Sequence, residues 1–378
     1  MRFAVIVLTG SKRVGLMKAE AMPIWLRNLR IKNSNKLILH SKPWITTEDI
    51  DAVTATIATG MLAQGMVVEE FESSCADWVG VGGGIAVASG SSAIELALRV
   101  LNLGVNDEVI LPTYVCKSVM EAILTVGATP VLCDIGKNWV VEPHNVESKI
   151  SNKTKAIIIP HMYGIFAEVN LFKKFNIPLI EDCAQALGDK SIDNVVADLG
   201  VLSFHPTKCL TCGEGGMLVS SDRNLLKQAK IIRDGNEMAN EKRVIAPMSD
   251  IQASLGLSQL RRYPDFLKRR REIAGKYLTH LAAINLRLVN YDAKASSMFF
   301  RLPLKVEGGL TKYQTKFLKK GIHIRKGVDR LLHRLSGLSD SDFPVATELF
   351  NNTISIPIYP NLNDEEVNAC IEALGLLR

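Results

Sequence analysis

The strongest constraint on the fold is an alternation of seven short apolar runs with helical patterns between residues 84 and 221. The runs are continuously apolar, as strands buried on both faces are. They cover residues 84–89, 108–112, 130–135, 155–163, 177–182, 200–204 and 215–221. Helical patterns such as SAIELALRVLNLG separate most of them. The sequence therefore predicts an α/β fold with a mainly parallel seven-stranded sheet covered by helices.

The pattern changes after residue 222 and predicts a smaller α+β domain. A long helix interrupted near Pro264 is followed by strand-like segments and two further helices. The strand-like segments are 297–304, 321–328 and 353–360, and the helices are 311–320 and 364–377. We therefore expect an unassigned N-terminal extension (1–38), a large domain (39–250) and a small C-terminal domain (251–378).

Composition excludes several classes of function. The net charge of +6 and the pI of about 8.8 suit an anionic small molecule, but they are too weakly basic to indicate a nucleic-acid partner. No apolar run approaches the roughly 20 residues that span a bilayer, so no membrane partner is expected. Seven scattered cysteines are typical of a reduced, cytoplasmic protein.

Cys209 and Cys212 form a C-x-x-C pair. A structural zinc site needs about four ligands, and the sequence has no second pair. A redox pair is expected at the start of a helix in a small βαβ unit, whereas this pair lies between two predicted strands. We therefore expect the two side chains to pack in the interior and predict no metal site.

Lys208 follows the buried run GVLSF and precedes a glycine-rich stretch, CGEGGM. An arbitrary lysine is usually solvated. A lysine in a partly desolvated pocket has a lowered pKa and can form a Schiff base with an aldehyde. Such a site also requires a phosphate cradle and a carboxylate for the ring nitrogen if the aldehyde is pyridoxal phosphate.

The sequence offers a candidate for the phosphate cradle and a candidate for the carboxylate. Gly90, Ser91 and Ser92 stand where a predicted strand becomes a helix, so amides and hydroxyls there can bind phosphate, although ordinary serine capping looks the same locally. Asp182 ends a buried strand and could protonate a pyridine nitrogen, or simply cap a helix. Gln185, three residues on, could bind the ring hydroxyl. The cradle, the carboxylate and the lysine follow one another at separate strand ends of one predicted sheet. This combination is more specific than any one of the three motifs alone.

These residues resemble the DegT/StrS-like family of sugar aminotransferases, which are fold type I pyridoxal-phosphate enzymes. The resemblance runs from about Lys42 to the C-terminus and includes ASGSSAIELAL, IEDCAQALG, SFHPTKCLTCGEGGMLVS and ISIPIYPNLNDEE. It implies that Lys208 is the Schiff-base lysine and proton shuttle. The cofactor-binding positions that it implies are Gly90, Ser91, Cys116, Asp182, Gln185, Ser203 and Lys208.

The family implies transfer of an amino group from L-glutamate to a keto-sugar by a cytoplasmic homodimer with shared active sites. Dehydratases of the family carry a histidine at the position of Lys208, so transamination is favoured. The acceptor is expected to be a nucleotide-linked keto-deoxysugar for surface polysaccharide or amino-sugar biosynthesis. Alternatives are a non-nucleotide keto-sugar acid or carbocyclic ketone, and a non-catalytic binding role.

The chain departs from the family pattern at three places. The first is the extension over residues 1–38, which has no counterpart in the family. Cys116 stands where an aromatic residue usually stacks on the cofactor, and Tyr114 is the nearest substitute. Ile245 and Pro247 replace an asparagine and an arginine that a partner subunit offers to the other active site.

Arg325 and Lys326 are candidates to face the diphosphate of a nucleotide-linked acceptor.

Overall fold

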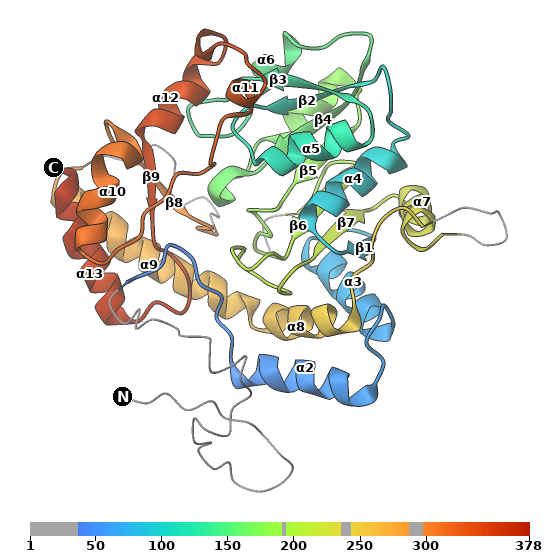
Figure 1. Ribbon diagram of the computed structural model, residues 1–378, viewed down its shortest axis with the longest axis horizontal. Helices are drawn as coiled ribbons and strands as arrows, with labels where there is room; N and C mark the ends of the chain where they lie inside the picture. Colours follow the sequence, from blue (N-terminus) through green and yellow to red (C-terminus); the bar gives the residue numbers. More distant parts are fainter. Residues whose placement is uncertain (1–36, 191–193, 236–242, 287–297) are drawn as a thin grey trace, which may run out of the picture. The chain divides into compact units, whose positions relative to one another are not determined.

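A seven-stranded sheet is the centre of the described structure (Figure 1), in the order β1-β7-β6-β5-β4-β2-β3. Its strands are β1 (Gly83–Val87), β2 (Glu108–Pro112), β3 (Thr129–Cys133), β4 (Thr154–Pro160), β5 (Leu179–Asp182), β6 (Leu199–Ser203) and β7 (Gly216–Ser220). β7 is antiparallel to both of its neighbours, and the other pairs are parallel. The prediction of a mainly parallel seven-stranded sheet is confirmed.

The computed structural model describes residues 37–190, 194–235, 243–286 and 298–378. From Ile38 to Arg378 the chain forms one unit. The longer helices are α2 (Thr47–Thr59), α3 (Met66–Trp78), α4 (Gly90–Val100), α5 (Lys117–Thr125), α7 (Arg223–Asp234), α8 (Asp250–Arg261), α9 (Tyr263–Ala283), α10 (Gly309–Lys319), α12 (Pro344–Asn352) and α13 (Asp364–Leu374). Short helical turns are α6 (Pro143–Glu147), α11 (Leu332–Leu335), η2 (Met162–Gly164), η3 (Val169–Phe175), η5 (Asp340–Asp342) and η6 (Gly375–Leu377).

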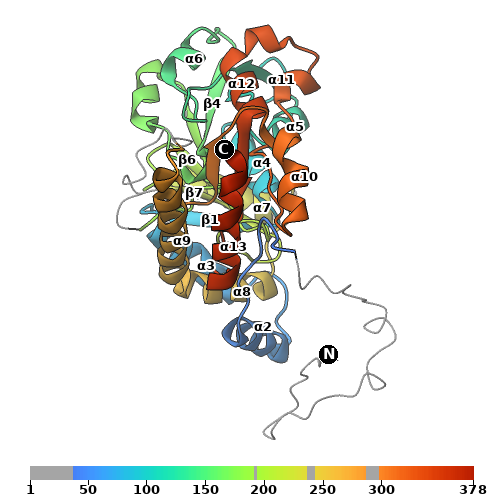
Figure 2. The ribbon, with the colours of Figure 1, turned by 90° about the vertical axis from the view of Figure 1, so that its left-hand side faces the viewer.

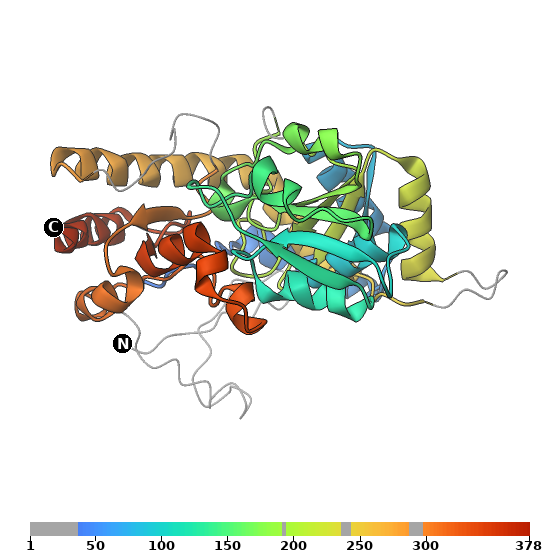
Figure 3. The same ribbon diagram turned by 90° about the horizontal axis from the view of Figure 1, so that it is seen from above.

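Helices cover both faces of the sheet (Figure 3). Successive side chains of a strand point to opposite faces, and β1 shows this directly. Val87 packs in the cluster that holds the buried faces of α4 and α5. Its neighbour Ala86 packs in the cluster that holds α3 and α8. Burial on both sides explains why the strand sequences are apolar throughout.

The C-terminal part of the chain has a hydrophobic cluster of its own. It contains side chains of α9, α10 and α13 and of a two-stranded antiparallel sheet, β8 (Leu302–Lys305) and β9 (Thr353–Ile356). The helices α9, α13 and α10 lie side by side in Figure 2, and β8 and β9 are labelled beside them in Figure 1. α9 begins in the α3–α8 cluster at Tyr263 and ends in the C-terminal cluster at Leu281. The predicted domain boundary at residue 250 stays a prediction.

Two predictions about this region have different outcomes. The predicted interruption near Pro264 is confirmed, because α8 ends at Arg261 and α9 begins at Tyr263. The predicted strand over 321–328 is wrong. This segment makes only isolated bridges, Ile322 with Ile38 and Arg325 with Ser355. Its two ends pair with different segments, so no continuous ladder forms.

The described helices include none that is both long enough and apolar enough to cross a membrane.

Candidate active site

The candidate site lies at the carboxyl ends of neighbouring strands, where ligands gather in α/β sheets. Asp182 is the last residue of β5 and pairs with Val201 of the adjacent β6. Ser203 is the last residue of β6, and Gly90 opens α4 after β1. A Cβ atom on Gly90 would lie 2.8 Å from Ser203 Cβ and 2.9 Å from its Oγ. A glycine is therefore required for the N-terminus of α4 to approach Ser203 this closely.

The N-terminus of α4 has free donors for an anion. Ser89 is the capping residue, and its Oγ accepts a hydrogen bond from Ser92 N at 3.1 Å. Ordinary capping is thus performed by Ser89, one residue before the predicted cradle. The amides of Gly90 and Ser91 belong to the first turn, which has no acceptors inside the helix. Together with the helix dipole they suit a phosphate group.

Asp182 is a buried carboxylate, only 6% exposed. Its Oδ1 accepts a hydrogen bond from Ala184 N at 2.9 Å, and no ion pair to it occurs among the described residues. Burial raises the pKa of Asp182, while the Ala184 amide and the nearby Lys208 charge lower it. In the described part of the chain no helix follows β5 directly, so Asp182 is not a helix cap. A buried carboxylate of this kind favours a cationic ligand atom.

Lys208 lies in the turn after β6, where its amide donates to His205 O at 2.8 Å. Its Nζ lies 5.6 Å from the centre of the Phe300 ring. Burial lowers the pKa of Lys208; the Asp182 charge opposes this shift and the Arg301 charge adds to it. A lowered pKa increases the fraction of neutral amine, the form that attacks an aldehyde.

A small pocket joins several of these groups. Its lining includes Gln185, Ser203, Lys208, Ala184, Met298 and Phe300. Gln185 Oε1 accepts a hydrogen bond from Tyr163 N at 2.9 Å, which fixes the orientation of the amide side chain. Three of the predicted site residues therefore share one pocket.

Cys116 and Tyr114 differ in their surroundings. Cys116 is exposed at the N-terminus of α5, where its Sγ accepts a hydrogen bond from Ser118 Oγ at 3.2 Å. Tyr114 is fully buried, and its hydroxyl lies 2.9 Å from the Tyr163 hydroxyl. Tyr114 is therefore held by Tyr163 in the interior, and Cys116 is the more accessible of the two.

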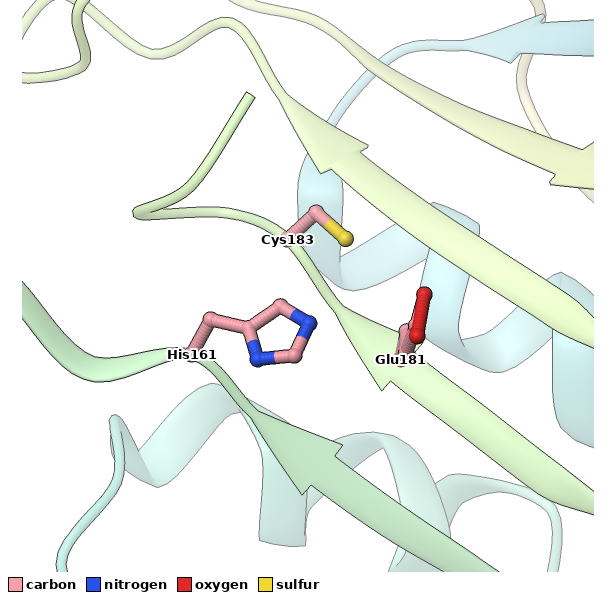
Figure 4. Close-up of side chains that lie close together, drawn as sticks. All are labelled: His161, Glu181 and Cys183. Carbon is pink, nitrogen blue, oxygen red and sulfur yellow. The ribbon is translucent and has the colours of Figure 1, made fainter. Parts of the chain in front are cut away.

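A buried polar cluster lies beside Asp182. His161, Glu181 and Cys183 place their ligand-type atoms within 4.8 Å of one another (Figure 4). Burial raises the pKa of Glu181 to about 7 and lowers the pKa of His161 to about 4. Glu181 accepts a hydrogen bond from Val196 N at 3.2 Å, and His161 Nδ1 accepts one from Ala167 N at 3.1 Å. These bonds attach two loops to the strands that carry the site.

Two other sequence features are located by the structure. Cys209 and Cys212 are buried free thiols in the α3–α8 cluster, so their predicted packing role is confirmed. Ile245 is buried in the cluster that holds α4 and α5, and Pro247 bridges to Val87 at the end of β1.

Sequence reasoning missed the residues that face Lys208 from elsewhere in the chain. Phe300 lies against Lys208, and Arg301 is close enough to lower its pKa. Tyr163 orients Gln185 and has a left-handed backbone with φ of 62°. None of these residues belongs to a local sequence motif that would have predicted its place in the site.

Comparison with known proteins shows which family the chain resembles over most of its length. Residues 43–375 match the DegT/DnrJ/EryC1/StrS aminotransferase family. The spore coat polysaccharide biosynthesis protein SpsC of Bacillus subtilis is 30% identical over 380 residues, which cover 91% of this chain and 98% of SpsC. A UDP-N-acetyl-3-dehydro-α-D-glucosamine 3-aminotransferase of Acidithiobacillus ferrooxidans is 30% identical over 317 residues, which cover 78% of this chain and 84% of the relative.

A solved structure shows the same fold. Spr1654 from Streptococcus pneumoniae, in its PMP form, superposes with a TM-score of 0.82 at 28% identity. The match covers 90% of this chain and 97% of Spr1654. The same protein is known in a PLP form, with a TM-score of 0.81.

The residues at the strand ends fit pyridoxal phosphate. The close approach of Gly90 to Ser203 leaves amides and a hydroxyl for a phosphate, Asp182 is a buried carboxylate suited to a protonated ring nitrogen, and Lys208 is an amine suited to the aldehyde. With the family match across residues 43–375, the conclusion is that this chain belongs to the DegT/DnrJ/EryC1/StrS family as a pyridoxal-phosphate-dependent aminotransferase of fold type I.

Proposed function

We propose that this chain transfers an amino group from L-glutamate to a nucleotide-linked keto-sugar in surface polysaccharide or amino-sugar biosynthesis. The observation that carries the proposal is the meeting of Lys208, Asp182, Gly90 and Ser203 at one edge of the sheet. The relative from Acidithiobacillus ferrooxidans, whose name specifies a UDP-linked keto-sugar, supports the acceptor class.

Each residue has a separate proposed role. The amides of Gly90 and Ser91 and the Ser203 hydroxyl bind the cofactor phosphate, Asp182 holds a proton on the ring nitrogen, and Gln185 orients the ring hydroxyl. When bound, pyridoxal phosphate supplies the electron withdrawal that stabilises a carbanion next to nitrogen. We propose that Cys116 lies at the ring face, because it stands at the position where the family pattern has a stacking aromatic residue.

Lys208 moves the proton. In the donor half-reaction its Nζ would take the proton from the reacting carbon of the amino donor and give it up on the side of the cofactor. In the acceptor half-reaction the same proton transfer would run in the opposite direction. A general acid and base contributes most when its pKa lies near the working pH. The burial that lowers the Lys208 pKa therefore serves both its attack on the aldehyde and its proton transfer.

We also propose a cytoplasmic homodimer with shared active sites. Free thiols at all seven cysteines agree with a reducing compartment. Large apolar side chains are exposed along α2 and the start of α3, as expected of a contact surface. They are Ile50, Ile57, Met61, Leu62 and Met66. Sedimentation of the M61E/M66E double variant tests this: a monomer supports the surface, and an unchanged dimer contradicts it.

An acceptor without a nucleotide is the second candidate. It is favoured by Ile245, which is buried in this chain's own interior rather than offered to a partner.

The test is a panel of keto-sugars, with and without a nucleotide, incubated with glutamate and scored by product mass. We expect a visible cofactor band that glutamate bleaches, and amine product from nucleotide-linked sugars. Product from free keto-sugar acids alone would favour the second candidate. A protein that stays colourless with added cofactor and gives no product would contradict both.

A further inference from the structure

The proposed cofactor chemistry leaves one nearby cation without a role. Arg301 Cζ lies 5.1 Å from the centre of the Phe300 ring, and Lys208 Nζ lies 5.6 Å from the same ring. The two positive groups thus share one aromatic neighbour. A fixed positive charge near the reacting amine opposes protonation of Lys208. An anionic ligand bound next to Arg301 would offset this repulsion.

Arg301 is held firmly but has no anionic partner in the described structure. Its Nη1 donates to the carbonyl of Lys326 at 3.0 Å. No carboxylate among the described residues lies within ion-pair distance of it. Its guanidinium is a rigid fork that suits a carboxylate. A partly buried guanidinium with unused donors beside a pocket is what an anionic ligand would require.

Arg301 lies near a second arginine, Arg325, and near a buried histidine, His40. His40 is 5% exposed, and its Nε2 lies 2.8 Å from Ser355 Oγ. Its Nδ1 is buried and has no hydrogen-bond partner. Burial lowers the pKa of His40, and the charges of Arg301, Arg325 and His323 lower it further.

The carboxylate of Asp329 acts on Arg301 from beyond ion-pair distance. The backbone of Arg325 pairs with Ser355 at 3.1 and 2.7 Å, which joins it to His40. One wall of the site thus carries two arginines, Arg301 and Arg325, and no carboxylate of the described residues forms an ion pair with either of them.

We propose that Arg301 binds the α-carboxylate of the amino donor, and that His40 and Arg325 extend this anion site so that it prefers a dicarboxylic amino acid. This inference rests on the proposed aminotransferase function. The α-carboxylate is bonded to the reacting carbon, so it must lie close to Lys208 Nζ during reaction. A diphosphate is separated from its reacting carbon by the sugar ring and fits this position less well.

The test uses the cofactor-loaded enzyme and separates its two halves. Rapid mixing follows loss of the visible band against glutamate concentration, and amine-form enzyme is then mixed with the keto-sugar. Arg301→Gln should raise the glutamate concentration at half-maximal rate by about 10- to 100-fold, because it removes charge-assisted hydrogen bonds. The acceptor half should change by less than about threefold. Arg301→Lys should recover part of the loss, since it restores charge without the fork.

Calorimetric binding of glutarate to the same proteins gives a readout that does not depend on turnover. Glutarate affinity should fall by a similar factor in Arg301→Gln, and a smaller loss is expected in Arg325→Gln. The surface variant Arg261→Gln is the matched control, because its side chain is 74% exposed with only a 3.5 Å pair to Glu70. Urea unfolding of each variant confirms that it is folded.

The outcomes are distinct. If Arg301→Gln leaves glutamate and glutarate binding unchanged, the inference is overturned, whatever happens to turnover. If Arg301→Gln weakens only the keto-sugar half-reaction, Arg301 binds an anionic group of the acceptor and not the donor carboxylate. This result also overturns the inference. If the parent enzyme never reacts with glutamate yet binds glutarate through Arg301, the proposed function fails and the anion site stands.

Discussion

The strand-end edge of the sheet and the wall formed by Phe300, Arg301 and the segment around Arg325 are built differently. Phe300 lines the pocket that holds Lys208, and Arg301 is close enough to lower the pKa of Lys208. The edge offers an acid at the end of a strand, helix amides, and an amine in the turn that follows the next strand. The wall offers cations held by carbonyls and aromatic rings on irregular backbone. From this difference we expect the edge to bind the cofactor and move the proton, and the wall to select the substrate. Changes at the edge should therefore impair both half-reactions, and changes in the wall only one.

The largest effect that tests this division is expected from Asp182→Asn. It removes a buried carboxylate whose proposed partner is a cationic ring nitrogen, a loss of roughly 3–5 kcal/mol. Both half-reactions should slow by about 10²- to 10⁴-fold. Single-turnover rates for glutamate and for the keto-sugar measure this. A loss confined to one half-reaction would break the comparison, because the edge would then serve only one substrate.

A smaller effect on stability is expected from Glu181→Gln. The folded pKa of about 7 lies above the ordinary value near 4.3, so Glu181 costs stability as pH rises through this window. At pH 8 the variant should be more stable than the parent by up to about 3 kcal/mol, with little difference near pH 4. His161, whose pKa of about 4 has the opposite sign of effect, is common to both proteins and cancels.

Urea unfolding at a series of pH values measures this difference. Glu147→Gln is the control, since its carboxylate is 61% exposed beside Lys174 and should change stability by less than about 0.5 kcal/mol. A pH-independent difference between Glu181→Gln and the parent would show that the pKa of Glu181 in the folded protein is close to its ordinary value, which would contradict this account.

The smallest effect is expected from Gly90→Ala. The added Cβ would lie 2.8 Å from Ser203 Cβ, so the cradle must open, at a cost of roughly 1–3 kcal/mol. Cofactor affinity should fall by about tenfold or more, measured by fluorescence titration of the cofactor-free protein. Gly275→Ala is the matched control, because nothing lies within 4 Å of its Cβ position, and an exposed helix interior favours alanine. Equal affinity in both variants would contradict the cradle.

The same two regions show what the sequence could predict. The edge was predictable because strand ends follow from apolar runs, and parallel strands bring their carboxyl ends to one side. Asp182 and Ser203 each end a strand, and Lys208 lies in the turn after the strand that Ser203 ends. The domain boundary and the cofactor roles of individual residues stay predictions.

The wall could not be predicted, because tertiary packing and not local pattern creates it. Arg301 is anchored by a carbonyl 25 positions away, and His40 by Ser355, 315 positions away. The segment 321–328 looks like a strand, yet its ends pair with different parts of the chain. A basic residue in such a segment gives no local sign of which pocket it faces.

The most direct measurement is chemical trapping of the cofactor on the protein. The cofactor-loaded enzyme is reduced with borohydride, digested, and its peptides are mapped by mass spectrometry. The account predicts that the reduced cofactor is attached to the side chain of Lys208 and to no other lysine. Attachment elsewhere, or a fully active enzyme that traps no cofactor at Lys208, would contradict it.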